Sequence, residues 1–308
     1  MVIKNNQGNL IVVELRREFK MSIPMEYIFQ SGSCLKKDLY QLIIDRLKAA
    51  GWVDISSLAS TDYVVLSSTG NTEDKQLLLN LRPIPAAGTA ANNVTTSNFS
   101  TMSYRLQTSY TPGAAGVAGT FGRPSLAWTD LVLMPTAVAT QYAQDTLVNY
   151  KVYADKNKII LALEYPAATG FSPIIIYLGQ PDTTYMSESK NAGCICATSA
   201  LATTAGSLTI CDSPDGMGTL AAPYAIPTKA FLPSKSPNNG NIFITSDIIY
   251  DSTTEGFRGK LDGLLCVTNT NVLTGDKHYE KGNEYYTLCC HTLTNTSFPS
   301  QAILVRIN

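Results

Sequence analysis

The sequence predicts a mainly β fold of the α+β type, in which a small N-terminal helix-plus-hairpin unit leads into a larger antiparallel β-sandwich or barrel-like body. Most apolar segments are short and alternate like strands between turn residues. Only one segment carries a sustained helical repeat, and helices and strands do not alternate as in parallel α/β proteins. We expect an N-terminal arm at 1–33, the helix-plus-hairpin unit at 34–101, and a β-rich body at 102–308 with an irregular insertion at 182–241.

The N-terminal arm contains a good strand at 10–15, which could pair with its own sheet or with the sheet edge of a neighbouring subunit. A helix is expected at 33–50, with Ser33 as its N-cap and Gly51 in the position that ends a helix. Apolar residues recur at helical spacing and mark its buried face: Leu35, Leu39, Leu42, Ile43 and Leu47. The charged residues of this segment, Lys36 among them, fall largely outside that face.

A hairpin follows the helix, with strands at 63–67 and 76–82. The next strand, at 102–110, lies between two loops that are rich in small residues and carry almost no charge. These loops, at 84–101 and 111–125, either become ordered only against a partner or are plain surface loops.

The body begins with the clearest sheet in the chain. Strands at 148–153 and 159–165 form a hairpin around an Asp-Lys-Asn-Lys turn, and an apolar third strand at 173–178 ends at Gly179. Further strands are expected at 207–211, at 241–245 with a continuation at 247–250, and at 261–267, 285–290 and 302–307.

Composition excludes several classes of function. The net charge of −1 and the pI of about 6.1 leave no basic stripe, so we expect no direct sequence-specific nucleic-acid binding. No apolar run approaches the roughly 20 residues of a membrane span, so we expect no membrane insertion. The N-terminal residues do not form a secretory signal, which indicates synthesis in a cytoplasm. Charged residues make up only 15% of the chain, and a low-charge surface lowers the desolvation cost of subunit contacts.

The seven cysteines match no zinc-site spacing and are too sparse for a disulfide scaffold. They are either small buried thiols or, for Cys194, Cys196 and Cys211, a late disulfide clamp. The sequence also leaves open whether Cys289 and Cys290 form disulfides.

Candidate reactive groups are few. Cys289 and His291 would share a strand face, so a metal pair or a Cys–His dyad is conceivable, but an ordinary strand near a subunit contact explains them as well. Carboxylates that could bind Ca²⁺ between loops are Asp212, Asp215, Asp247 and Asp251. The first two belong to a sequence that also makes a good turn without an ion.

No Gly-x-Ser-x-Gly elbow and no phosphate-binding loop occurs in the chain. We therefore assign no catalytic, cofactor-binding or metal-binding residue. The expectation is a protein that is not an enzyme and that carries no cofactor.

Turn-and-core patterns occur in three stretches, namely 149–163 with 175–179, 35–52 with 68–70, and 258–263 with 275–276 and 282–286. In the first stretch a strand, an Asp-Lys turn and an apolar strand are followed by a further strand that ends in Tyr-Leu-Gly. Together the three stretches resemble structural proteins of tailed-bacteriophage particles. The resemblance implies a virion subunit of the neck or collar, tail or baseplate, assembled in the host cytoplasm. Its partners would be other copies of itself and neighbouring virion structural proteins.

Two alternatives remain open. In the first, the chain is a host-receptor or carbohydrate-binding module of a phage tail, with the insertion at 182–241 as a cluster of binding loops. In the second, it is a surface polysaccharide depolymerase that uses a pair of carboxylates.

Overall fold

The computed structural model describes about half of the chain as regular structure and its adjoining turns. The described residues are 2–4, 10–12, 27–57, 63–74, 76–83, 102–106, 109–122, 129–130, 145–166, 174–180, 195–197, 207–210, 221–225, 246–252, 256–268, 273–280, 282–290 and 301–308. Strands make up most of the described residues and helices only a small part, so the prediction of a mainly β fold is confirmed. Within these ranges, no helix has the length and apolar character that crossing a membrane requires.

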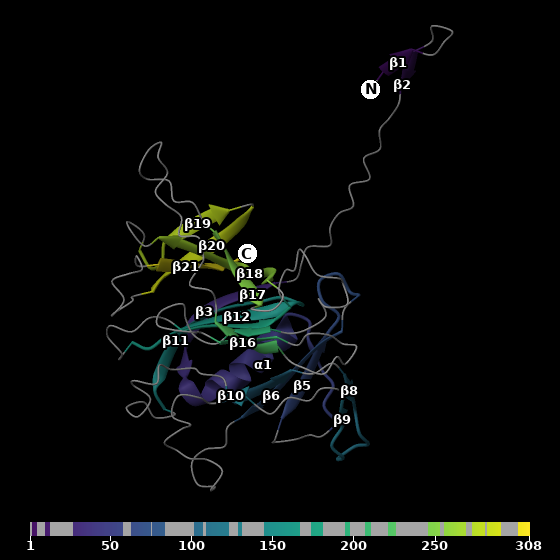
Figure 1. Ribbon diagram of the computed structural model, residues 1–308, viewed down its shortest axis with the longest axis vertical. Coiled ribbons are helices and arrows are strands. Elements are labelled where there is room, and N and C mark those ends of the chain that lie inside the picture. Colours follow the sequence, from purple (N-terminus) through teal and green to yellow (C-terminus); the bar gives the residue numbers. More distant parts are fainter. Residues whose placement is uncertain are drawn as a thin grey trace.

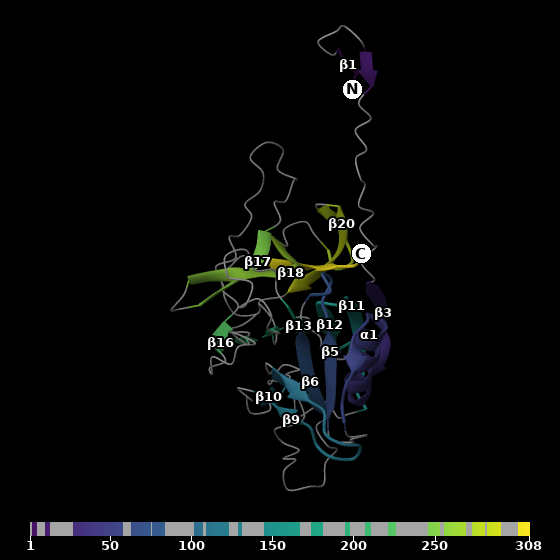
Figure 2. The same ribbon diagram turned by 90° about the vertical axis from the view of Figure 1, so that its right-hand side faces the viewer.

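The central sheet has seven antiparallel strands in the order β16-β15-β14-β13-β12-β11-β3. Their bounds are Ile28–Leu35 (β3), Leu147–Ala154 (β11), Lys158–Glu164 (β12), Ile174–Gly179 (β13), Ile195–Ala197 (β14), Ser207–Ile210 (β15) and Ala221–Ala225 (β16). The first of these strands in the sequence, β3, forms one end of the sheet (Figure 2). The hairpin predicted around the Asp-Lys-Asn-Lys turn is confirmed as β11 and β12.

A second sheet and the helix cover one face of the central sheet (Figure 1). The sheet has the order β10-β7-β6-β5-β4. Its strands are Val53–Asp54 (β4), Val64–Ser68 (β5), Leu77–Pro83 (β6), Met102–Leu106 (β7) and Thr129–Asp130 (β10). Helix α1, Leu39–Ala49, contacts β3, β11 and β12 of the central sheet and β6 of the second sheet. Side chains from all three share one hydrophobic core.

The third sheet lies on the opposite face of the central sheet and has the order β17-β18-β21-β20-β19 (Figure 1). Its strands are Ser246–Ser252 (β17), Gly256–Thr268 (β18), Lys277–Glu280 (β19), Asn283–Cys290 (β20) and Gln301–Arg306 (β21). All three sheets have two edge strands in the described part of the chain, so the sandwich alternative fits the body. The described strands of the insertion, β14 to β16, extend the central sheet.

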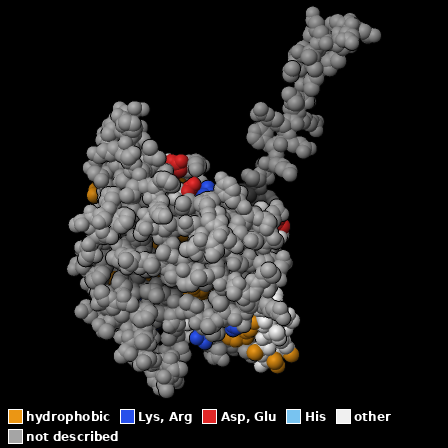
Figure 3. Space-filling model, viewed as in Figure 1, with side chains coloured by type: hydrophobic (Ala, Val, Ile, Leu, Met, Phe, Trp, Pro, Cys, Tyr) orange, Lys and Arg blue, Asp and Glu red, His pale blue; other side chains and the backbone are white. Residues whose placement is uncertain are grey.

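Two short ribbons complete the described strands. One pairs Val2–Lys4 (β1) with Leu10–Val12 (β2) and lies apart from the three sheets in both views (Figures 1 and 2). The other pairs Tyr110–Thr111 (β8) with Thr120–Phe121 (β9). Exposed apolar side chains gather over this second ribbon (Figure 3).

The predicted start of the helix is wrong. Ser33 does not cap it, because Ser33 lies in β3, opposite Asn149 of β11. A 3-10 turn at Lys36–Asp38 follows, and the α-helix begins at Leu39. Residues 33–35 form a strand and not the start of the helix, because residues 28–35 pair continuously with β11.

The buried face of the helix is confirmed in its α-helical part, where Leu39, Ile43 and Leu47 have no exposed surface. Gly51 is confirmed at the helix end with φ +97°, a conformation that favours glycine. The expectation that Lys36 lies outside the buried face is wrong, because its side chain is fully buried.

The two loops that are rich in small residues differ in outcome. The loop at 84–101 lies outside the described residues. The loop at 111–125 is described as far as Gly122, where it forms the β8–β9 ribbon within a single copy.

Candidate functional site

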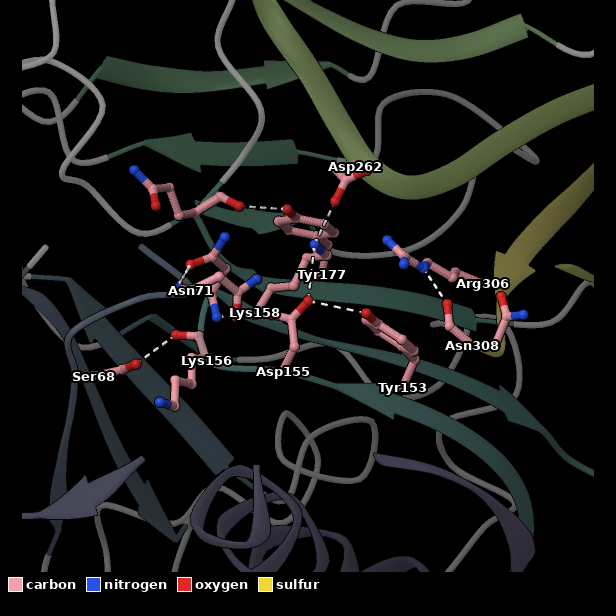
Figure 4. Close-up of polar contacts among 12 residues, drawn as sticks. Ser68, Asn71, Tyr153, Asp155, Lys156, Lys158, Tyr177, Asp262, Arg306 and Asn308 are labelled. Carbon is pink, nitrogen blue, oxygen red and sulfur yellow. Dashed lines mark hydrogen bonds and ion pairs between the residues drawn. The ribbon is translucent and has the colours of Figure 1, made fainter. Parts of the chain in front are cut away.

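A group of buried polar side chains surrounds the turn that joins β11 to β12 (Figure 4). We call this turn, Asp155 to Lys158, and the side chains bonded to it the polar clamp. The side chains of Asp155 and Lys158 are almost fully buried. Asp155 Oδ1 accepts hydrogen bonds from the backbone N–H groups of Asn157 and Lys158 at 2.7 and 3.0 Å. An aspartate at this position therefore closes the turn with its own side chain.

The end of the helix and the turn between β5 and β6 hold the polar clamp on one side. Trp52 Nε1 donates to the carbonyl of Asp155 at 2.9 Å, and Ser68 Oγ donates to the carbonyl of Lys156 at 2.5 Å. The backbone N–H of Asn71 donates to Asn157 Oδ1 at 2.8 Å. These bonds tie the central sheet to the segments of the second sheet and helix through polar groups that would otherwise lack partners.

The third sheet reaches the polar clamp through Asp262 of β18. Lys158 Nζ lies 2.6 Å from Asp262 Oδ2 and 3.3 Å from Asp155 Oδ2. The Tyr153 hydroxyl donates to the same Asp155 oxygen at 3.0 Å. One buried ammonium is thus shared between a carboxylate of its own turn and a carboxylate of another sheet, which compensates for its loss of hydration.

The electrostatics of the polar clamp follow from burial and from these charges. Burial acts to raise the pKa of Asp262, but Lys158, Arg306 and Lys260 outweigh it and hold that pKa below its ordinary value. Burial raises the pKa of the Tyr153 phenol, and the nearby Asp155 carboxylate raises it further. Tyr153 therefore stays protonated at neutral pH and acts as a donor to Asp155.

Two glycines let the backbone approach this closely. Gly179 has φ +140°, and a Cβ there would lie 2.3 Å from the carbonyl oxygen of Asn157. Gly263 has φ +90°, and its Cβ would lie 2.7 Å from Cδ1 of Ile160. Next to Gly179, the N–H of Gln180 donates to Asn157 O at 2.8 Å, while Tyr177 Oη donates to Gln180 O at 2.6 Å.

Aromatic and cationic side chains close the remaining side of the polar clamp. The ring of Tyr27 stacks on that of Tyr153 with centroids 5.9 Å apart. The guanidinium of Arg306 lies 5.5 Å from the Tyr153 centroid. Because its buried charges are already paired, this arrangement holds the sheets together.

Most of the candidate reactive residues lie outside the described part of the chain, namely Cys194, Cys211, Asp212, Asp215 and His291. Of Cys196 only the backbone, in β14, is described. Asp247 and Asp251 both lie in β17, and Asp247 is 3.7 Å from Lys260. Cys289 and Cys290 end β20. Within the described ranges, no three His, Cys, Asp or Glu side chains are grouped so that they could hold a metal ion.

The sequence analysis identified the segments that form the polar clamp but did not predict that they contact one another. The Asp-Lys-Asn-Lys turn, the Tyr-Leu-Gly close, Gly51-Trp52 and the Asp262-Gly263 pair all stand in the three stretches noted above. No local pattern indicates that Lys158 meets a carboxylate 104 residues later in the chain. The burial of Lys36, a second buried lysine, was also not predicted, because it stands among charged residues that are exposed.

No family model matches the chain, and no curated protein matches it.

Proposed function

We propose that this chain is a structural subunit of a tailed-phage particle, in the neck or collar, tail or baseplate. It assembles with other copies and with neighbouring virion proteins through sheet edges and loops, and it performs no catalysis. The observation that carries this proposal is the character of β3, the edge strand of the central sheet.

In the part of the chain that the structure describes, β3 has none of the features that protect an edge strand. It runs for eight residues without a charged side chain, and its register with β11 has no shift. Ser31, Gly32 and Ser33 are exposed. Soluble proteins usually shield such edges with charges, prolines, bulges or short length, because an open edge pairs with other strands. A chain that leaves this edge uncovered is suited to assembly.

The β8–β9 ribbon provides the corresponding loop surface. Its tip, residues 112–118, has no charge, and Val117 is 55% exposed. Ser57 Oγ donates to the carbonyl of Val117 at 2.8 Å, and the Tyr110 hydroxyl lies 3.0 Å from that same Oγ. An apolar tip held in one conformation loses little entropy when it docks, which favours a contact with another protein.

The resemblance to phage structural proteins supports the same proposal. Its three stretches all contribute to the polar clamp, which joins the three sheets into one body. A particle component has to transmit contacts on several sides without deforming, and a satisfied buried polar network provides such rigidity.

The proposal is tested on particles produced by the genome that encodes this chain. Quantitative mass spectrometry of the purified particles, with an isotope-labelled copy of the chain as standard, should find it in many copies per particle. Absence from the particles, with the chain left in the lysate supernatant, contradicts the proposal. Turnover of a polysaccharide by the purified chain would also contradict it.

A further inference from the structure

We propose that β3 of one copy pairs antiparallel with β3 of a second copy, about a two-fold axis at Gly32. This inference rests on the proposed function and names the partner of the edge on which that function depends. The two central sheets would then form one continuous sheet across the pair.

The hydrogen bonds within the copy establish which backbone groups are free to make this contact. The N–H of Lys36 donates to Thr146 O at 2.9 Å, and Lys36 and Thr146 continue the register of β3 and β11. In an antiparallel ladder the bonded pairs alternate, so even-numbered residues of β3 point their N–H and C=O groups toward β11. The odd-numbered residues Phe29, Ser31 and Ser33, with Leu35, point theirs to the outer edge.

A two-fold axis at Gly32 satisfies all of these outward groups. It places Ser31 of one copy opposite Ser33 of the second copy, and Phe29 opposite Leu35. Each of these residues then both donates and accepts a bond, as in a closely bonded antiparallel pair. Moving the axis by one residue, to Ser31, leaves the outward groups of Leu35 beyond the paired region.

Gly32 suits the position on the axis. A Cβ at this residue would lie 2.8 Å from the hydroxyl of Tyr150, whose ring crosses β3 and is itself largely buried. With no side chain at the centre, the two strands approach without steric conflict. The absence of charge from Tyr27 to Leu35 means that pairing a strand with its own copy brings no like charges together.

The other described edges of this chain fit β3 less well. β4 and β10 have two residues each. β16 contains Pro223 and shifts register against β15. β17 contains Asp247 and Asp251 and shifts register against β18. β19 begins with a lysine and ends with a glutamate. Short length, prolines, bulges and charges disfavour edge pairing, so among the edges of the three sheets the best complement of β3 is β3 itself.

Two double variants of the full chain test the pairing and its register. S31K/S33K places lysine opposite lysine at both symmetry-related positions, whereas S31K/S33E places lysine opposite glutamate. Both variants lose the same bond from Ser33 Oγ to Asn149 Oδ1, and both alter only exposed residues of the single copy. Equal thermal midpoints for the two variants, measured in dilute solution where both are monomeric, establish that they fold equally well.

The readout is the dimer dissociation constant from sedimentation over a wide range of concentrations. We expect wild type to dimerise, S31K/S33K to weaken the dimer at least about tenfold, and S31K/S33E to remain within about threefold of wild type. The proposal is overturned if wild type stays monomeric, if S31K/S33K dimerises like wild type, or if both variants weaken the dimer equally. The last result would mean that β3 takes part in the contact but pairs in a different register or with a different strand. None of these results bears on the copy number in particles. The proposed function is therefore tested independently of the pairing of β3.

Discussion

At the scale of single residues, Gly179 shows how a missing Cβ positions a whole turn. Its positive φ and its approach to Asn157 leave no room for a side chain. The Tyr-Leu-Gly close in the sequence therefore has a physical reason that is specific to this fold: the strand end has to lie against the β11–β12 turn.

We expect Gly179→Ala to lower the free energy of unfolding by about 3 kcal/mol or more, because it combines backbone strain with a steric clash. Gly116→Ala is the matched control. Gly116 also has a positive φ, of +81°, but nothing lies within 4 Å of its Cβ position, so only strain of ~1 kcal/mol is expected. Urea unfolding of both variants measures the difference, and equal effects would show that the close approach is unimportant.

Lys36 is a buried cation whose Nζ has no hydrogen-bond partner among the described residues. Burial lowers its pKa from 10.5 to about 8. The unfolded chain then binds more protons than the folded chain between about pH 8 and 10.5. The contribution of Lys36 is consequently most destabilising below pH 8 and fades as the pH rises through that window.

We expect Lys36→Met to raise the free energy of unfolding by about 1–3 kcal/mol at neutral pH, because it removes an uncompensated buried charge. The gain should shrink as the pH rises from about 8 to 10.5. Burial raises the pKa of the neighbouring Cys34 thiol to about 11, which acts in the opposite direction. The test is therefore the difference between variant and wild type at each pH, and a difference that does not change with pH contradicts this account.

At the scale of elements, the ion pair of Lys158 with Asp262 attaches the third sheet to the central sheet. The pKa of Asp262 is lowered in the folded state, so its stabilisation is present above the unfolded-state pKa and is lost as the pH falls through the folded-state value. Acid should therefore loosen the third sheet first.

We expect Asp262→Asn to lower the free energy of unfolding by about 1–2 kcal/mol at neutral pH. This is less than for a fully buried pair, because the Asp262 side chain is 40% exposed and water screens it. Amide exchange in β18 and β21 should become faster, with less further change in acid than in wild type. Lys37→Met, which breaks an exposed pair with Asp145, is the control and should leave those amides unchanged. Equal exchange in wild type, Asp262→Asn and Lys37→Met would show that the pair of Lys158 with Asp262 does not attach the third sheet.

Sequence reasoning succeeded where the cause of an element is local. The β11–β12 hairpin was predictable because alternation and turn chemistry both act over a few residues. The helix start was not, because Leu35 fits a helical repeat as well as a strand, and only the pairing of β3 with distant β11 decides between them. The polar clamp could not be predicted for the same reason. Asp155 closes its turn locally, but the contact of Lys158 with Asp262 depends on the stacking of two sheets.

At the scale of the whole molecule, three sheets share interior surfaces, while the long edge of the central sheet stays open. The buried charges of the polar clamp are used within the chain, and the uncharged surfaces lie at β3 and at the tip of the β8–β9 ribbon. This division between a rigid interior and neutral exposed edges is what an assembly subunit requires.

Amide hydrogen exchange of β3 tests this division most directly, in the dilute chain and in the purified particle. The outward N–H groups of Phe29, Ser31 and Ser33 should exchange rapidly in the dilute single copy. In the particle, where another strand covers the edge, they should exchange far more slowly, while the inward groups of Gln30 and Gly32 change little. Outward groups that exchange equally fast in both states would contradict the central claim that this edge is buried by assembly.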